Sequence, residues 1–161
     1  MWTETGLDLS EAVFFDAGDL NLVDVPDAWV AVQDAIEVLL EHELRPICLG
    51  GDHAITYPIV KGFWGQYDKL SILHFDAHPD LYDNFENNPH SHASPFARIM
   101  ENNLADRLVQ VGIRTATGHQ REQAERFGVE MIEMKDLPDK LHIEFDGPVY
   151  VSVDIDGLDP A

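Results

Sequence analysis

The chain has 161 residues, of which 30 are Asp or Glu and 10 are Lys or Arg, so its formal charge is −20. Such a charge disfavours nucleic acid and anionic membranes as partners, and it favours the attraction of small cations. The composition is 45% hydrophobic, Cys48 is the only cysteine, and the sequence contains neither a secretion signal nor an apolar run near the ~20 residues of a membrane span. We therefore expect a single cytoplasmic domain over residues 1–161.

The N-terminal part of the chain predicts a strand followed by a helix. Residues 12–15 are apolar and precede a polar turn, which is typical of a short buried strand. Apolar side chains then recur at helical spacing over residues 28–40, with Asp24 placed to cap the helix and Pro26 suited to its first turn. We expect this amphipathic helix to pack on a sheet, with Trp29 in the core.

A second short strand is predicted at residues 47–49, and it ends at Gly50 and Gly51. Two glycines allow the backbone a sharp or left-handed turn, which would direct His53 out of the carboxyl end of the sheet. A helix over roughly residues 56–64 follows. A single histidine in this position is more often a helix cap or a hydrogen-bonded residue than a metal ligand.

The central feature of the sequence is the apolar run 70–75, which ends in Asp76, His78 and Asp80. In an extended chain, side chains two residues apart point to the same face, so these three groups are predicted to converge. Two carboxylates and one imidazole suit a hard divalent cation. This segment therefore predicts a metal site at the end of a buried strand.

A polar segment over residues 81–92 separates this strand from the next helix. Long loops at the carboxyl end of a strand commonly carry substrate contacts. Ser94 is placed to cap the following helix and Pro95 to occupy its first position. His90 and His92 lie just before it, where a proton donor would be useful, although surface histidines without a role are equally compatible with the sequence.

The C-terminal part alternates strands and helices. Strands are predicted at 107–114, 129–132 and 148–153, with a helix at 119–127, and the last strand ends in Asp154 and Asp156. This alternation implies right-handed crossovers and a mostly parallel sheet, and we expect an α/β fold. Ligands of such sheets bind beyond the carboxyl ends of the strands, where the candidate residues lie.

The candidate residues together favour a two-metal centre. Carboxylates placed this densely at apolar strand ends would repel one another, and a cation is the simplest remedy. Four Asp and two His from three strand ends can hold two ions with bridging carboxylates, and two ions can activate a bridging water. The oxygen-rich donor set favours Mn over Zn, whereas the Irving–Williams order favours Zn.

Three segments resemble the signatures of the ureohydrolase family, which includes arginase, agmatinase and formimidoylglutamase. Residues 91–100 and 111–114 extend the resemblance toward the agmatinase and plant-type arginase branch. The family fold implies a three-layer α/β/α arrangement with a mostly parallel central sheet. The three segments are residues 50–53 (Gly-Gly-Asp-His), 76–80 (Asp-Ala-His-Pro-Asp) and 152–160 (Ser-Val-Asp-Ile-Asp-Gly-Leu-Asp-Pro).

The resemblance implies a ligand set for two Mn²⁺ ions per subunit, in which Asp76 and Asp154 bridge. By the same resemblance, His92 is the loop histidine that handles protons near the substrate, with His90 as the fallback. We class His92, Asp76 and His78 as the catalytic residues. The implied ligands are His53, Asp76, Asp80 and Asp154 for one ion, and His78, Asp76, Asp154 and Asp156 for the other.

The implied reaction is attack of a bridging hydroxide on the guanidinium carbon of a small cationic substrate, which gives urea and an amine. Family members that bind the α-carboxylate and α-amino groups of arginine usually carry Asn shortly after the Asp-x-His-x-Asp motif and acids after Gly-x-Arg. Here Leu81, Tyr82 and residues 115–117 occupy those places. We therefore expect agmatine, cleaved to putrescine and urea, with arginine as the alternative. The resemblance also implies a homo-oligomer, a trimer or hexamer, for the full-length protein.

Two departures from the family pattern lead to a further hypothesis. Family members continue past the Asp-Pro motif with more strands, and they begin earlier than this chain. We hypothesise a fragment that is incomplete at its C-terminus and lacks some N-terminal residues; a natural protein with its stop after Ala161 would refute this. The competing interpretations are a deacetylase with a single zinc, and a truncated metal-binding or interaction module without catalytic activity.

Overall fold

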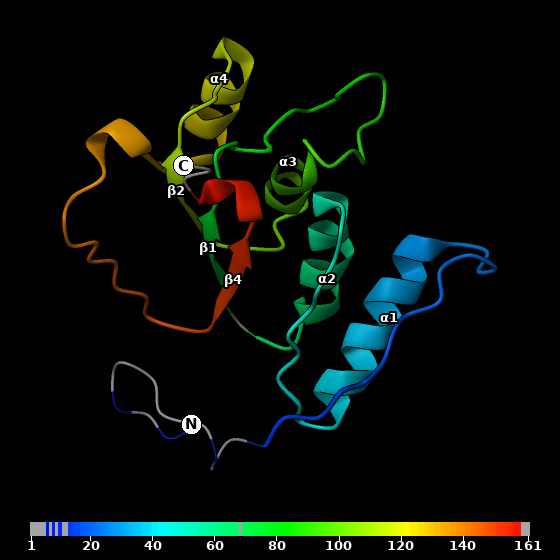
Figure 1. Cartoon of the computed structure of the whole chain (residues 1–161). Helices are drawn as coiled ribbons and strands as arrows, with labels where there is room; N and C mark the ends of the chain where they lie inside the picture. Colours follow the sequence, from blue (N-terminus) through cyan, green and yellow to red (C-terminus); the bar gives the residue numbers. More distant parts are fainter. Residues whose placement is uncertain (1–5, 7, 9, 11–12, 68, 159–161) are drawn as a thin grey trace.

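The computed structural model describes residues 6, 8, 10, 13–67 and 69–158. Its centre is a four-stranded sheet in which every neighbouring pair is parallel, in the order β3-β2-β1-β4 (Figure 1). The parallel sheet expected from the sequence is confirmed, and each of its strands was predicted to within one residue. The strands are β1 (Ser71–Phe75), β2 (Arg107–Ile113), β3 (Glu130–Glu133) and β4 (Val149–Val153).

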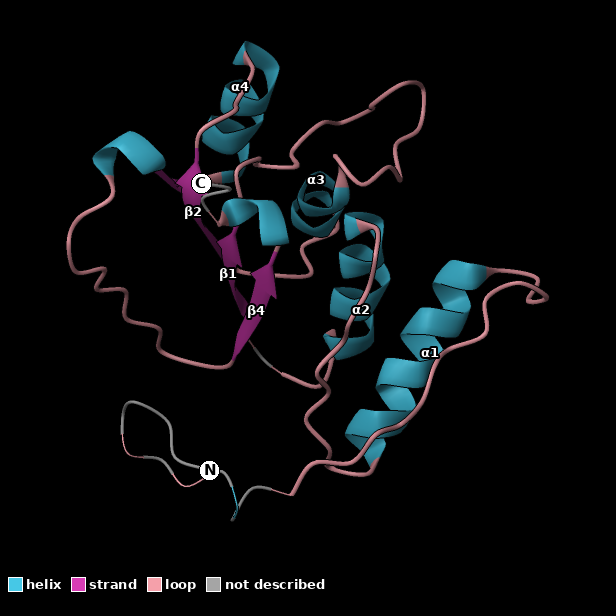
Figure 2. Ribbon diagram, viewed as in Figure 1, coloured by secondary structure: helices cyan, strands magenta, loops and turns pink. Residues whose placement is uncertain are grey.

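The helices alternate with these strands as predicted (Figure 2). No helix in the described part of the chain is long and apolar enough to cross a membrane. The α-helices are α1 (Ala28–Glu41), α2 (Thr56–Phe63), α3 (Pro95–Glu101) and α4 (Gly118–Phe127), and the short 3-10 helices are η2 (His53–Ile55), η3 (Met134–Asp136) and η4 (Ile155–Gly157).

The core lies between the sheet and three of the helices. Phe96 of α3, Ile72 of β1 and Leu108 of β2 are almost completely buried in one cluster, which also takes Val60 from α2 and Ala124 from α4. Helices α2, α3 and α4 therefore share one face of the sheet (Figure 1). This packing holds the carboxyl ends of the strands, and the loops that follow them, in fixed positions.

Helix α1 packs on α2, which corrects the expectation that it lies on the sheet. The contact is close because α2 carries Gly62, where a Cβ atom would lie only 2.8 Å from the Cβ of Ile36. Ile36 is the buried residue of α1. Trp29 is half-buried and lies outside the buried core cluster in which it was expected, although its ring packs against Tyr57 of α2 with centroids 6.1 Å apart.

Two helix caps differ from the sequence-based prediction. Asp27, not Asp24, caps α1, because it directly precedes the first turn and its carboxylate accepts the amides of Trp29 at 2.9 Å and Val30 at 3.3 Å. Ser94 precedes α3 but makes no side-chain cap, and its hydroxyl lies 3.2 Å from the hydroxyl of the buried Ser91 instead.

The two short strands predicted before β1 are not formed by the described residues. Residues 13–15 are unpaired and exposed, with Phe15 82% exposed, and Ala12 lies outside the described residues. Residues 47–49 are likewise unpaired, and Leu49 is 95% exposed. A strand needs a neighbour for its backbone hydrogen bonds, and the described part of the chain offers none at either place.

Candidate metal centre

The predicted ligands meet at one edge of the sheet, beyond the carboxyl ends of β1 and β4. The two strands are in register, with Phe75 opposite Val153, so Asp76 and Asp154 are the next residues of neighbouring strands. The amide of Asp154 donates to the carbonyl of Phe75 at 2.9 Å, which continues the pairing to the site itself. The expectation that separate strand ends supply these side chains is therefore met for β1 and β4.

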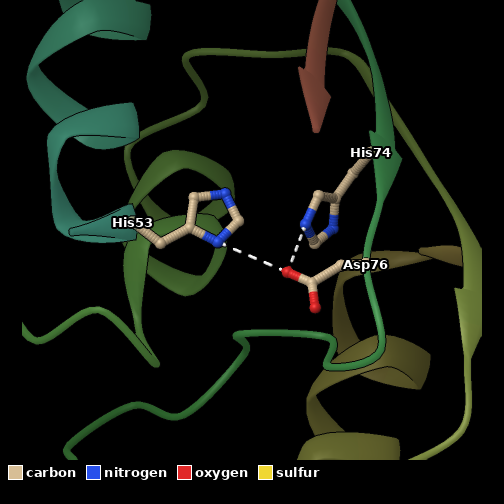
Figure 3. Close-up of side chains that lie close together, drawn as sticks. All are labelled: His53, His74 and Asp76. Carbon is tan, nitrogen blue, oxygen red and sulfur yellow. Dashed lines mark hydrogen bonds and ion pairs between the residues drawn. The ribbon is translucent and has the colours of Figure 1, made fainter. Parts of the chain in front are cut away.

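The first cluster of side chains surrounds His53, at the start of η2. Its Nδ1 lies 2.8 Å from Oδ2 of Asp80, 3.4 Å from Oδ2 of Asp76 and 3.6 Å from Oδ2 of Asp154. Figure 3 shows His53 and Asp76 directed at each other. These four residues are the ones that the resemblance to the ureohydrolase family assigned to the first ion.

The second cluster lies on the other side of Asp76. Nδ1 of His78 is 3.1 Å from Oδ2 of Asp156 and 3.4 Å from Oδ1 of Asp76. Asp154 belongs mainly to the first cluster, because its Oδ1 accepts the amide of Asp156 at 3.1 Å while its Oδ2 faces His53. Asp76 thus offers one carboxylate oxygen to each cluster, which is the arrangement that a bridging ligand requires.

The backbone produces this geometry in a way that the sequence did not indicate. Residues 76–80 do not continue the strand, because the amide of His78 donates to Oδ1 of Asp76 at 2.6 Å and bends the chain. Asp80 then has a positive φ of 46°, which an aspartate tolerates better than most residues. As a result, Asp76 and Asp80 face His53 while His78 turns to Asp156, so the prediction that all three converge on one face was wrong.

A glycine, Gly157, lies where the chain passes close to the backbone of Asp76. A Cβ atom on Gly157 would lie 3.1 Å from the Cα and the amide nitrogen of Asp76. Of the sharp or left-handed turn expected at Gly50 and Gly51, the left-handed alternative does not occur, although the chain bends at Gly51. At Gly50 the side chain of Ile55 fills the space that a Cβ atom would need, so the constraint is packing and not φ.

Sequence reasoning missed His74 and Gln110. His74 is completely buried in β1, and its Nε2 lies 2.9 Å from Oδ2 of Asp76 (Figure 3). Gln110 of β2 is also completely buried, and its amide nitrogen lies 3.1 Å from Nδ1 of His74. The strand period of two places Ile72, His74 and Asp76 on one face, and this was the signal that could have identified the histidine.

The charges around His53 fit a cation. Burial by itself would lower the pKa of the imidazole, but the carboxylates of Asp76 and Asp80 outweigh burial and raise it to about 10. For Asp76, burial opposes ionisation, yet the neighbouring imidazoles of His53 and His74 hold its pKa well below the ordinary value. Burial and the neighbouring Asp76 raise the pKa of Asp156.

These residues therefore fit divalent metal ions. Nδ1 of His53 is buried, faces three carboxylates, and makes no hydrogen bond of acceptable geometry within the described residues. In the absence of a cation the cluster takes up a proton instead, and a metal ion would displace that proton. The groups His53–His74–Asp76 and Asp76–His78–Asp156 each bring three donor atoms within 4.8 Å of one another.

The metal-free protein is expected to lose stability as the pH rises toward 10. The pKa of His53 is about 10 in the folded protein, whereas its ordinary value is 6.5. Its contribution to the free energy of unfolding is therefore complete below pH 6.5 and disappears as the pH rises through about 10. Urea unfolding in the presence of a chelator, between about pH 6 and pH 10, measures this. His53→Gln should flatten that slope, whereas His142→Gln at an exposed site should keep it. A parent protein equally stable at both ends of this range would contradict the expectation.

The predicted proton-transfer residue lies beside the clusters and not within them. His92 and His90 line a cavity of about 240 Å³ together with Asp52 and Glu86. Asp52 directly precedes His53 and caps η2 by accepting the amide of Ala54 at 2.7 Å. His90 packs against the ring of Trp29, with centroids 5.4 Å apart. The structure thus brings both histidines to an acidic cavity next to the first cluster.

A model of the arginase family matches residues 1–161. The chain belongs to the arginase family. Among its relatives, the arginase of Glycine max is 45% identical over 175 residues, which cover 98% of this chain and 50% of that protein. The agmatinase of Bacillus subtilis is 33% identical over 159 residues, which cover 96% of this chain and 55% of that protein.

The arginase fold predicted from the sequence is also confirmed by comparison with solved structures. A putative agmatinase from Clostridium difficile superimposes with a TM-score of 0.81 at 24% identity, over 98% of this chain and 59% of that one. At this identity the likeness concerns the fold alone. The chain spans about half the length of the curated arginase-family proteins that it matches.

Proposed function

We propose that this chain carries the dinuclear metal centre of a ureohydrolase, which cleaves a guanidino substrate into urea and an amine. The observation that carries the proposal is the placement of Asp76 between two clusters, with Oδ2 facing His53 and Oδ1 facing His78. A deacetylase with a single zinc would need only one cluster. The two ions proposed are Mn²⁺, because four carboxylates and two imidazoles form an oxygen-rich donor set.

The side chains of this chain supply binding, orientation and proton transfer. His53, Asp76, Asp80 and Asp154 would hold one ion, and His78, Asp76, Asp154 and Asp156 the other. Two metal ions held in this way would lower the pKa of bound water and polarise the substrate. His92 is proposed to carry a proton on its imidazole to the leaving amine, which is strongly basic and needs one.

The acidic lining of the cavity beside the clusters supports a cationic substrate. Asp52 and Glu86 line the same cavity as His92. A cavity lined by carboxylates concentrates cations and disfavours anions. The net charge of −20 for the whole chain acts in the same direction. Nucleic acid and anionic membranes are accordingly not proposed as partners.

Agmatine and arginine are both candidates, and each has an observation in its favour. In some family members, the positions held here by Leu81, Tyr82 and residues 115–117 bind the α-carboxylate and α-amino groups of arginine. Two of these side chains have structural roles here, since Leu81 is completely buried in the core and Thr117 caps α4. This favours agmatine. The greater identity to a plant arginase, 45% against 33% for an agmatinase, favours arginine.

Urea release with agmatine and arginine, measured side by side in the presence of Mn²⁺, tests the proposal. We expect Mn²⁺-dependent urea from one of the two, and loss of that activity after chelation. Metal counting on the purified protein, with two ions expected, separates this centre from a mononuclear zinc site. Two bound ions without urea from either substrate would support the interpretation as a metal-binding module without catalysis.

We also propose that residues 1–161 are part of a larger ureohydrolase domain. Among the residues that the structure describes, no strand pairs with the outer edge of β4, and a groove of about 640 Å³ is lined by Val149, Tyr150 and Val151 together with residues 45–48. Val151 is 54% exposed although its strand is apolar. An open apolar edge of this kind is normally covered by another strand, and the intact mass of the natural protein tests the proposal. The cytoplasmic location and the trimer or hexamer stay predictions.

A further inference from the structure

We propose that His74 and Gln110 are positioning residues, which fix the orientation of the Asp76 carboxylate through a directed chain of hydrogen bonds. The inference rests on the proposed role of Asp76 as the ligand shared by two ions. Neither residue belongs to the predicted ligand set. Both are completely buried, on the neighbouring strands β1 and β2, directly behind Asp76.

The chain of hydrogen bonds begins at Gln110. Its amide nitrogen lies 2.6 Å from the carbonyl oxygen of Pro79, which can only accept a hydrogen bond. The nitrogen must therefore occupy this position, since the opposite amide orientation would bring two acceptor oxygens together. The same nitrogen lies 3.1 Å from Nδ1 of His74 and donates its second hydrogen there.

This arrangement selects one tautomer of His74. Because Nδ1 accepts from Gln110, the proton of the neutral ring is on Nε2. Nε2 lies 2.9 Å from Oδ2 of Asp76 and donates to it. The main-chain amide of His78 donates to Oδ1 at 2.6 Å. Each carboxylate oxygen of Asp76 is thus held by one protein donor, and each keeps a lone pair directed at its own cluster.

The alternative that His74 is itself a metal ligand is less compatible with these contacts. Although His53, His74 and Asp76 offer donor atoms within 4.8 Å of one another, both ring nitrogens of His74 already have protein partners. The ring is also packed against Phe96, with centroids only 4.1 Å apart, on the helix side of the sheet. Histidines and carboxylates behind metal ligands commonly act in this supporting way.

The test compares Mn²⁺ binding by the parent chain and by variants matched in shape. His74→Gln places an amide donor near the position of Nε2, whereas His74→Phe fills the space without a donor. Gln110→Met removes the start of the chain of hydrogen bonds. Gln123→Met, at another buried glutamine in α4, is the matched control for that change.

We expect His74→Phe and Gln110→Met to bind Mn²⁺ roughly 10- to 100-fold more weakly. His74→Gln and Gln123→Met should stay close to the parent. The spin-coupled EPR signal of a Mn²⁺ pair, which depends on the shared carboxylate, should change in the two weakened variants and return in His74→Gln. A role limited to packing would not produce this rescue. If His74→Phe does not fold, Gln110→Met carries the same comparison.

Two results would overturn the inference while leaving the proposed function intact. One is parent-like Mn²⁺ affinity in both His74→Phe and Gln110→Met. The other is loss of one whole ion in both His74 variants, which would identify His74 as a ligand. A parent chain that binds no Mn²⁺ at all would overturn the proposed function, and this inference with it.

Discussion

Asp76→Asn is expected to weaken the binding of both metal ions by roughly 100-fold or more, since loss of a supporting group alone already costs 10- to 100-fold. The change removes a negative charge that the two clusters share. It also replaces one acceptor oxygen of this side chain by a donor nitrogen. In the parent protein, His74 and the main-chain amide of His78 donate to the two oxygens of Asp76. One of these donors would then face another donor. Calorimetric titration with Mn²⁺ and metal counting measure the effect.

Asp139→Asn is the matched control for this substitution. Asp139 is exposed on the loop between β3 and β4, and it belongs to neither cluster of candidate ligands. The same change of charge there should leave both the affinity and the number of bound ions unaltered. Two ions bound to Asp76→Asn as tightly as to the parent would refute the bridging role of Asp76.

Phe96→Ala is expected to lower the free energy of unfolding by about 3–5 kcal/mol. The ring is completely buried in the core cluster. It contacts His74 with centroids 4.1 Å apart and His53 with centroids 5.5 Å apart. Its removal would therefore leave a cavity behind both imidazoles, and it should weaken metal binding as well as the fold. Urea unfolding of the metal-free protein measures the stability change.

Phe14→Ala provides the comparison for Phe96→Ala, because Phe14 is 70% exposed. An exposed side chain with few contacts should change the stability by no more than about 0.5 kcal/mol. If the two variants were destabilised equally, the core assigned to α3 and β1 would be wrong.

The sequence was most informative where an apolar strand ends in acidic residues. The runs before Asp76 and Asp154 could be recognised as strands, and the parallel pairing of the two places both strand ends at one edge. The expectation that the second of these strands is buried was wrong, because Val151 and Val153 of β4 are more than half exposed. The helices followed from their apolar spacing and from Pro95 at a helix start. These features are local, so a pattern of a few residues is enough to predict them.

Other features depend on partners far away in the sequence. Residues 47–49 have the composition of a strand, but pairing requires a neighbour that the described residues do not provide. The resemblance to the family divided the ligands between two ions, but the backbone that separates them, with its bend at His78 and the positive φ of Asp80, is seen only in the structure. No pattern of alternating side chains predicts such a bend.

The sequence by itself determined which donor groups this chain carries and in which order: acids and histidines in three segments that resemble the signatures of the family to which the chain belongs. Only the tertiary structure decided which oxygen of Asp76 faces which cluster, and that His74 and Gln110 support it from behind. The physical reason is that hydrogen bonds depend on direction, and the donors that orient Asp76 come from residues up to 36 positions apart along the chain, His74 and Gln110.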